Sequence, residues 1–99
     1  MDTTNSSYFV NSVAKGLSVL MAFDSQDRQM TITELEKKTN INKATVRRFA
    51  LTLVDLGYLT ITDNNKFELT PKVLDLAARY LESLNLPDIA HPILERISS

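Results

Sequence analysis

The chain has no cysteine, no tryptophan and a single histidine among its 99 residues. Without cysteine it can form no disulfide, no thiolate nucleophile and no cysteine-ligated zinc site. His91 precedes a proline and has no carboxylate partner at metal-ligand spacing. We therefore expect neither a metal site nor a bound cofactor.

Long apolar runs are also missing. No stretch approaches the roughly 20 apolar residues that span a bilayer, and the polar residues 1–7 lack the basic start and apolar core of a signal peptide. The length fits one small domain. We expect a cytoplasmic protein with no membrane partner.

Features of enzymes are scarce as well. The two glycines, Gly16 and Gly57, are too far apart for a phosphate-cradling loop. Glu34 and Glu36 are two residues apart on a predicted helix, so they do not share a face as a carboxylate pair would. A chain this short also has little room for a shaped, water-excluding pocket. We expect no catalytic residues and no enzymatic activity.

Positive charge is concentrated in one stretch although the net charge is −1. Residues 37–54 contain no acid and the following bases: Lys37, Lys38, Lys43, Arg47 and Arg48. Such a run by itself indicates a solvated helix face. Whether the run has a function beyond solubility depends on which predicted elements carry it.

The first predicted helix begins at an Asn11 or Ser12 cap and runs to about Phe23. Its apolar positions are Val13, Leu17 and Leu20, and the stripe is widened by Val19, Met21 and Phe23. Gly16 in mid-helix costs about 1 kcal/mol relative to alanine. Close approach of a neighbouring helix would explain a glycine here, and so would chance.

Two further helices follow with a short break between them. Thr33 and Glu36 match a capping box that starts a helix reaching about Thr39. After the break at residues 40–42, Asn42 caps a third helix that Gly57 ends in a left-handed turn. The third helix has an apolar face with helical spacing at Val46, Phe49, Ala50 and Leu53, continued by Leu56. This order is a helix-turn-helix with a basic second helix.

After Gly57 the pattern alternates, as in strands. Residues directly opposite each other in an antiparallel pair lie on the same face of the sheet, so apolar residues should pair with apolar residues. A three-residue loop at residues 63–65 achieves this, because it sets Ile61 opposite Phe67 and Leu59 opposite Leu69. Asn65 suits the left-handed position of such a loop. Residues 30–32 are extended in pattern but too short to stand alone as a strand.

The remaining chain is predicted to be helical. Thr70 and Pro71 start a fourth helix that reaches about Leu84, and a last helix begins near Asp88. The last helix carries an apolar stripe that indicates a partner surface. The fold class is therefore mainly α with a small β-hairpin: a winged helix-turn-helix domain at residues 1–86, then a linker helix at residues 87–99.

The outer face of the third helix suits the major groove of DNA, where arginine binds guanine edges or phosphates and threonine or alanine methyls contact thymine. The hairpin tip would lie on the adjacent backbone or minor groove. The candidate DNA-binding residues are Thr33, Asn42, Lys43, Ala44, Thr45, Arg47, Arg48, Thr52, Asn64, Asn65 and Lys66. The alternatives are that the arginines keep the helix soluble or pair with surface acids, that the asparagines serve turn geometry, and that Leu51 packs against a neighbour.

Four segments resemble the amino-terminal domain of the IclR family of bacterial transcription regulators. They are SVAKGLSVL (12–20), MTITEL (30–35), NKATVRR (42–48) with Leu53 and LGY (56–58), and FELTPKVL (67–74). Together the likeness covers about residues 9–98. Arg47-Arg48-Phe49 with Leu51-Thr52-Leu53 further resembles the family's branch that controls aromatic-acid catabolism.

The resemblance implies sequence-specific binding of double-stranded DNA by a homodimer that contacts itself through the opening helix and the linker. We assign the dimer contacts to Val19, Phe23, Ile93 and Ile97. Family members bind a small-molecule effector through a carboxyl-terminal domain, which this chain lacks. The competing hypothesis is a winged-helix module for protein interaction or dimerisation that does not bind DNA; the net acidic charge and the apolar stripe of the last helix favour it.

Overall fold

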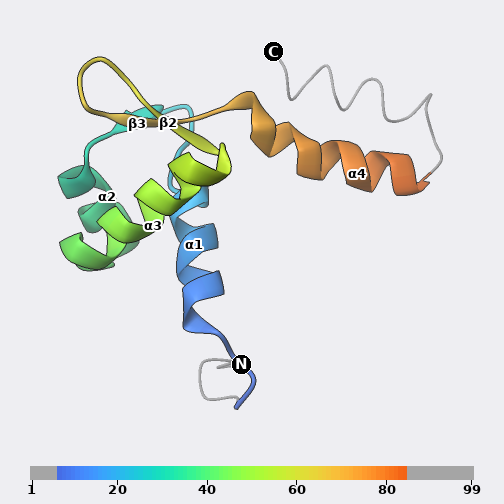
Figure 1. Cartoon of the computed structure of the whole chain (residues 1–99), viewed down its shortest axis with the longest axis horizontal. Coiled ribbons are helices and arrows are strands. Elements are labelled where there is room, and N and C mark those ends of the chain that lie inside the picture. The colour runs from blue at the N-terminus through green and yellow to red at the C-terminus, as the bar shows by residue number, and fades with distance from the viewer. Residues whose placement is uncertain (1–6, 85–99) are drawn as a thin grey trace.

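The structure, a computed structural model, describes residues 7–84. In this range there are four α-helices: α1 (Asn11–Met21), α2 (Ile32–Thr39), α3 (Lys43–Leu56) and α4 (Leu74–Leu84). Three short strands, β1 (Gln29–Met30), β2 (Leu59–Ile61) and β3 (Phe67–Leu69), form one sheet, and a 3-10 turn η2 (Pro71–Val73) precedes α4. The predicted fold class, a winged helix-turn-helix, is confirmed (Figure 1).

The sheet is antiparallel in the order β1-β3-β2. The predicted hairpin register is confirmed, with Leu59 opposite Leu69 and Ile61 opposite Phe67. Asn65 takes the left-handed conformation at φ 61°. The sequence did not predict β1: this segment pairs with β3 through Met30 and Phe67, so it is stabilised by a partner distant in sequence.

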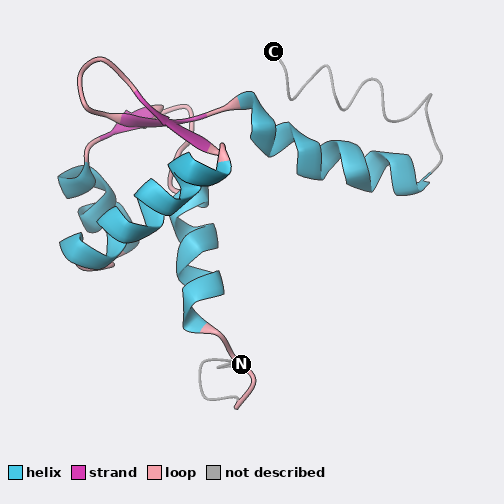
Figure 2. Ribbon diagram, viewed as in Figure 1, coloured by secondary structure: helices cyan, strands magenta, loops and turns pink. Residues whose placement is uncertain are grey.

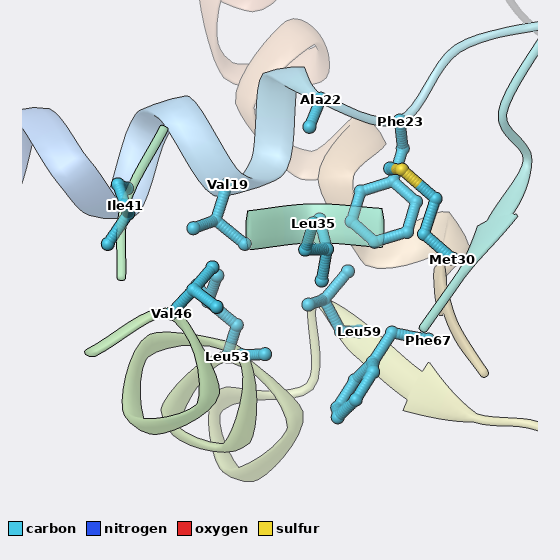
Figure 3. Close-up of a cluster of buried hydrophobic side chains, with 11 residues drawn as sticks. Val19, Ala22, Phe23, Met30, Leu35, Ile41, Val46, Leu53, Leu59 and Phe67 are labelled. Carbon is cyan, nitrogen blue, oxygen red and sulfur yellow. The ribbon is translucent and has the colours of Figure 1, made fainter. Parts of the chain in front are cut away.

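A single apolar core holds α1, α2, α3 and the sheet together. Val19 from α1, Leu35 from α2 and Leu59 from β2 converge in it and are almost fully buried (Figure 3). The complete cluster is Val19, Ala22, Phe23, Met30, Leu35, Ile41, Val46, Ala50, Leu53, Leu59 and Phe67. Two residues predicted for the apolar face of α3 lie at its edge, because Phe49 is half-buried and Leu56 is 53% exposed.

The ends of α1 and α2 differ from the prediction. Val10 is the N-terminal cap of α1 and provides no side-chain hydrogen bond, so neither Asn11 nor Ser12 is the cap. The capping box of α2 is formed by Thr31 and Glu34 instead of Thr33 and Glu36. The backbone enters α2 directly from β1, so the first helical turn begins two residues earlier than predicted.

The helix α4 extends away from the three-helix body (Figure 2). The predicted start at Thr70 and Pro71 begins the 3-10 turn η2, where Thr70 accepts a hydrogen bond from the backbone N–H of Lys72, and α4 itself begins three residues later at Leu74. The predicted last helix and the linker at residues 87–99 lie outside the described residues. None of the helices described in residues 7–84 is long and apolar enough to cross a membrane.

Candidate nucleic-acid interface

Polar contacts hold the start of the basic helix α3. The Asn42 side chain accepts a hydrogen bond from the Thr45 N–H at 2.9 Å, as predicted. The Glu36 carboxylate accepts a hydrogen bond from the Lys43 N–H at 3.1 Å, so Glu36, a residue of α2, also caps α3. A carboxylate stabilises the positive end of the helix dipole. Glu36 therefore links the start of α3 to α2.

The turn between the two helices relies on a left-handed asparagine. Asn40 has φ 59° and ends α2, and its N–H donates to the Glu36 carbonyl. Ile41 then enters the core, where it is 8% exposed. The sequence marked this segment as a break without assigning these roles. Asparagine tolerates the left-handed region better than most residues, so the left-handed conformation of Asn40 could have been predicted from its residue type.

The outer face of α3 is open to solvent. Arg47, Arg48 and Ala44 are exposed, and Thr45 is half-buried. Leu51 packs against the core, which confirms that its role is packing. The residue types that suit base edges and phosphates are therefore uncovered within their own subunit.

One basic side chain of the acid-free stretch, Lys38, is engaged in ion pairs. Within residues 7–84 the ion pairs are both made by Lys38, whose Nζ lies 2.9 Å from Asp24 Oδ2 and 2.8 Å from Asp27 Oδ2. These hydrogen bonds raise the pKa of Lys38, that to Asp27 most, and the bond from Lys38 lowers the pKa of Asp24. Neither arginine of α3 forms an ion pair with a described residue, so the hypothesis that they pair with surface acids gains no support from this part of the chain.

The wing presents Asn64 and Asn65 at its exposed tip and a half-buried Lys66 beside them. The Thr62 hydroxyl accepts hydrogen bonds from the N–H groups of Asn64 and Lys66, at 3.3 and 3.2 Å. These bonds fix the shape of the loop. This function of Thr62 was not predicted from the sequence, although threonine is common in such local turns.

The candidate residues do not all gather on one element. Thr33 is exposed in the first turn of α2, whereas Asn42, Lys43 and Thr52 are exposed on α3 or its cap. Thr52 donates its hydroxyl hydrogen to the Arg48 carbonyl at 2.8 Å.

The assignment of dimer contacts to Val19 and Phe23 is wrong. These side chains are 0% and 7% exposed and belong to the core of their own subunit. The exposed apolar residues of α1 are Val13, Leu17 and Met21, which recur every fourth position along one face. The other two assigned residues, Ile93 and Ile97, lie outside the described residues.

Comparison with known proteins identifies this arrangement. The model of the IclR helix-turn-helix domain matches residues 12–62. The chain is 44% identical over 90 residues to the Pca regulon regulatory protein of Pseudomonas putida, covering 91% of this chain and 31% of that protein. It is 37% identical over 86 residues to the p-hydroxybenzoate hydroxylase transcriptional activator of Acinetobacter baylyi, covering 87% of this chain and 31% of that protein.

Solved structures agree with the sequence relatives. An IclR family transcriptional regulator from Brucella abortus matches with a TM-score of 0.76 and 32% identity, over 91% of this chain and 35% of that one. A transcriptional regulator from Rhodococcus sp. RHA1 matches with a TM-score of 0.69 and 47% identity, over 91% of this chain and 36% of that one. The chain thus spans about a third of the length of these relatives, whose names describe transcription regulators. By its sequence and its fold, the chain belongs to the IclR family as a helix-turn-helix DNA-binding domain.

Proposed function

We propose that the chain binds double-stranded DNA sequence-specifically, as the DNA-binding part of a dimeric bacterial transcription regulator. In this proposal α3 lies in the major groove and the wing contacts the adjacent backbone or minor groove. The observation that carries the proposal is the uncovered outer face of α3, where Arg47 and Arg48 are exposed and form no ion pair with a described residue.

The chemistry of this face matches DNA. Arginine forms bidentate hydrogen bonds with guanine, and the methyl group of Ala44 can contact thymine. Asn42 and Lys43, at the positive end of α3, are suited to phosphates. The exposed Asn64 and Asn65, with Lys66 beside them, extend the interface to the wing.

The dimer rests on a separate observation. Val13, Leu17 and Met21 form an exposed apolar stripe on α1, and we propose that a second copy of the chain covers it. A two-fold dimer would place its two α3 helices in successive major grooves, so the bound site would be a near-palindrome. On α4, Leu76, Tyr80 and Leu84 are also exposed at every fourth position and could extend this contact.

The names of the relatives suggest which genes are regulated. The Pca and p-hydroxybenzoate regulators are related to this chain over about nine-tenths of its length. We propose that the complete regulator controls genes of aromatic-acid catabolism and senses a small molecule through parts of the protein outside this chain.

Selection of duplexes from a random pool by the purified chain tests the DNA proposal. We expect enrichment of one near-palindromic sequence, and an affinity that falls steeply as salt rises, because phosphate contacts release counterions. If no sequence is enriched, the proposal of sequence-specific binding is wrong, and a module that only binds proteins or dimerises becomes the better account.

A further inference from the structure

A polar groove lies between the first half of α1 and the outer flank of α3. Its volume is about 410 Å³, and it is lined by Ser12, Lys15, Thr45, Arg48, Phe49 and Thr52. The two helices meet beside it at Gly16, where an added Cβ would lie 3.9 Å from the Phe49 ring. The packing of α1 against α3 therefore creates the groove.

The groove is positively charged. Among residues 7–84, its lining includes one lysine and one arginine and no carboxylate. Lys15 and Arg48 are exposed, so both cations reach solvent at the mouth of the groove. The hydroxyls of Ser12 and Thr45 add donors beside them, whereas the hydroxyl hydrogen of Thr52 is used on the Arg48 carbonyl. Two cations with neighbouring hydroxyl donors suit a phosphate group.

The position of the groove selects the kind of phosphate. Thr45, Arg48 and Thr52 follow one another at three- and four-residue spacing, so they lie along one flank of α3. Arg47 does not line the groove and, about 100° from Arg48 around the helix, lies on a different side. When a helix lies in the major groove, its flanks face the sugar-phosphate strands that bound that groove.

We infer that the α1–α3 groove binds a backbone phosphate of the DNA, held by Lys15 of α1 and Arg48 of α3. This inference rests on the proposed function and adds α1 to the DNA interface. It also divides the two arginines: Arg48 contacts the backbone, and Arg47 is left to bind base edges. From the sequence, Ser12 was named only as a possible helix cap and Lys15 was not singled out, since only the packing of α1 on α3 brings them to the flank of α3.

The test compares three variants with the wild-type chain on two duplexes, the selected sequence and an unrelated one of equal length. Lys15→Gln removes the proposed phosphate contact, and Lys15→Arg keeps the charge. Arg79→Gln, on α4 outside the groove, removes one positive charge elsewhere as the matched control. Affinity is measured by fluorescence anisotropy at several salt concentrations.

We expect Lys15→Gln to weaken binding to both duplexes by a similar factor, several-fold at about 0.1 M salt. The slope of log affinity against log salt should fall by about 0.9 for each protomer bound, which is about 1.8 for a dimer on the near-palindrome. Lys15→Arg should bind like the wild type, and Arg79→Gln should keep the wild-type slope. If Lys15→Gln behaves like Arg79→Gln while the wild type binds the selected duplex, the groove assignment alone is overturned. If the wild type binds neither duplex, the proposed function fails together with it.

Neutral methylphosphonates placed one at a time along the selected duplex locate the contact. We expect one position in each half-site where neutralisation weakens the wild type several-fold but leaves Lys15→Gln almost unaffected, because the partner is already missing. If Lys15→Gln and the wild type respond equally at every position, Lys15 does not contact a phosphate and the inference is overturned.

Discussion

Replacing each of the two glycines by alanine should change stability in opposite directions. Gly57 ends α3 with φ 93°, a left-handed conformation that costs a residue with a Cβ about 1–2 kcal/mol. Its Cβ would also lie 3.2 Å from Lys72 Cδ. The Lys72 ammonium donates to the Leu56 carbonyl at 2.9 Å at the end of α3, so moving this side chain weakens a second contact. We expect Gly57→Ala to destabilise the chain by about 2 kcal/mol.

Gly16→Ala is the matched control. Gly16 lies inside α1 without a positive φ, and an added Cβ would make an ordinary contact, 3.9 Å from Phe49 Cδ1. Alanine in a helix interior is favoured over glycine by about 0.5–1 kcal/mol. The structure thus leaves room for a methyl group, and the close helix approach suggested by the sequence does not require glycine.

Urea or thermal denaturation followed by circular dichroism measures both effects. At this size, 1 kcal/mol corresponds to a shift of about 4–8 °C in melting temperature. A Gly57→Ala variant as stable as the wild type would refute the left-handed end of α3. A Gly16→Ala variant destabilised as much as Gly57→Ala would refute the packing of α1 on α3.

Three further predictions concern the scaffold. Thr31→Ala should cost about 1 kcal/mol of unfolding free energy because it removes the cap of α2, whereas Thr33→Ala should change it little; equal costs in denaturation would contradict the capping box. Leu35→Ala should cost about 2–5 kcal/mol, since Leu35 is fully buried, and a smaller loss in the same assay would mean a looser core. The hydrogen bond from Lys38 holds the pKa of Asp24 below its ordinary 3.8. The contribution of Asp24 to the stability of the fold is therefore present above pH 3.8 and is lost as the pH falls through the lowered pKa. Lys38→Met should return this pKa toward 3.8 in an NMR titration, and an unchanged pKa would disprove the pairing.

The hairpin and α3 could be predicted because their signals are local. Alternation of apolar and polar residues fixes which faces match, and only one loop length pairs Ile61 with Phe67. Asn42 and Gly57 have side-chain and backbone properties that mark helix ends wherever they occur.

The start of α2 could not be predicted in the same way. Thr31 with Glu34 and Thr33 with Glu36 both match the capping-box pattern. The choice depends on β1, whose residue Met30 pairs with Phe67, so the chain leaves the sheet just before Thr31. That pairing joins residues 37 positions apart, and no local pattern contains it.

The dimer contacts failed for a related reason. Apolar residues lie on two sides of α1, and periodicity does not say which side faces inward. Packing against α2 and α3 buries Val19, and Met21 on another side remains 78% exposed. The place of Lys15 in the groove could not be predicted from the sequence either, since it depends on how α1 packs against α3.

The affinity of the Arg47→Ala and Arg48→Ala variants for the selected duplex is the most direct measurement of the central claim, that the exposed face of α3 enters the major groove. We predict that each substitution weakens binding by about 1–3 kcal/mol. Arg47→Ala should also reduce the preference for the selected duplex over the unrelated one. Circular dichroism should show both variants folded, because these side chains lie outside the core. If both folded variants bind the selected duplex as tightly as the wild type, α3 is not the element that contacts the bases.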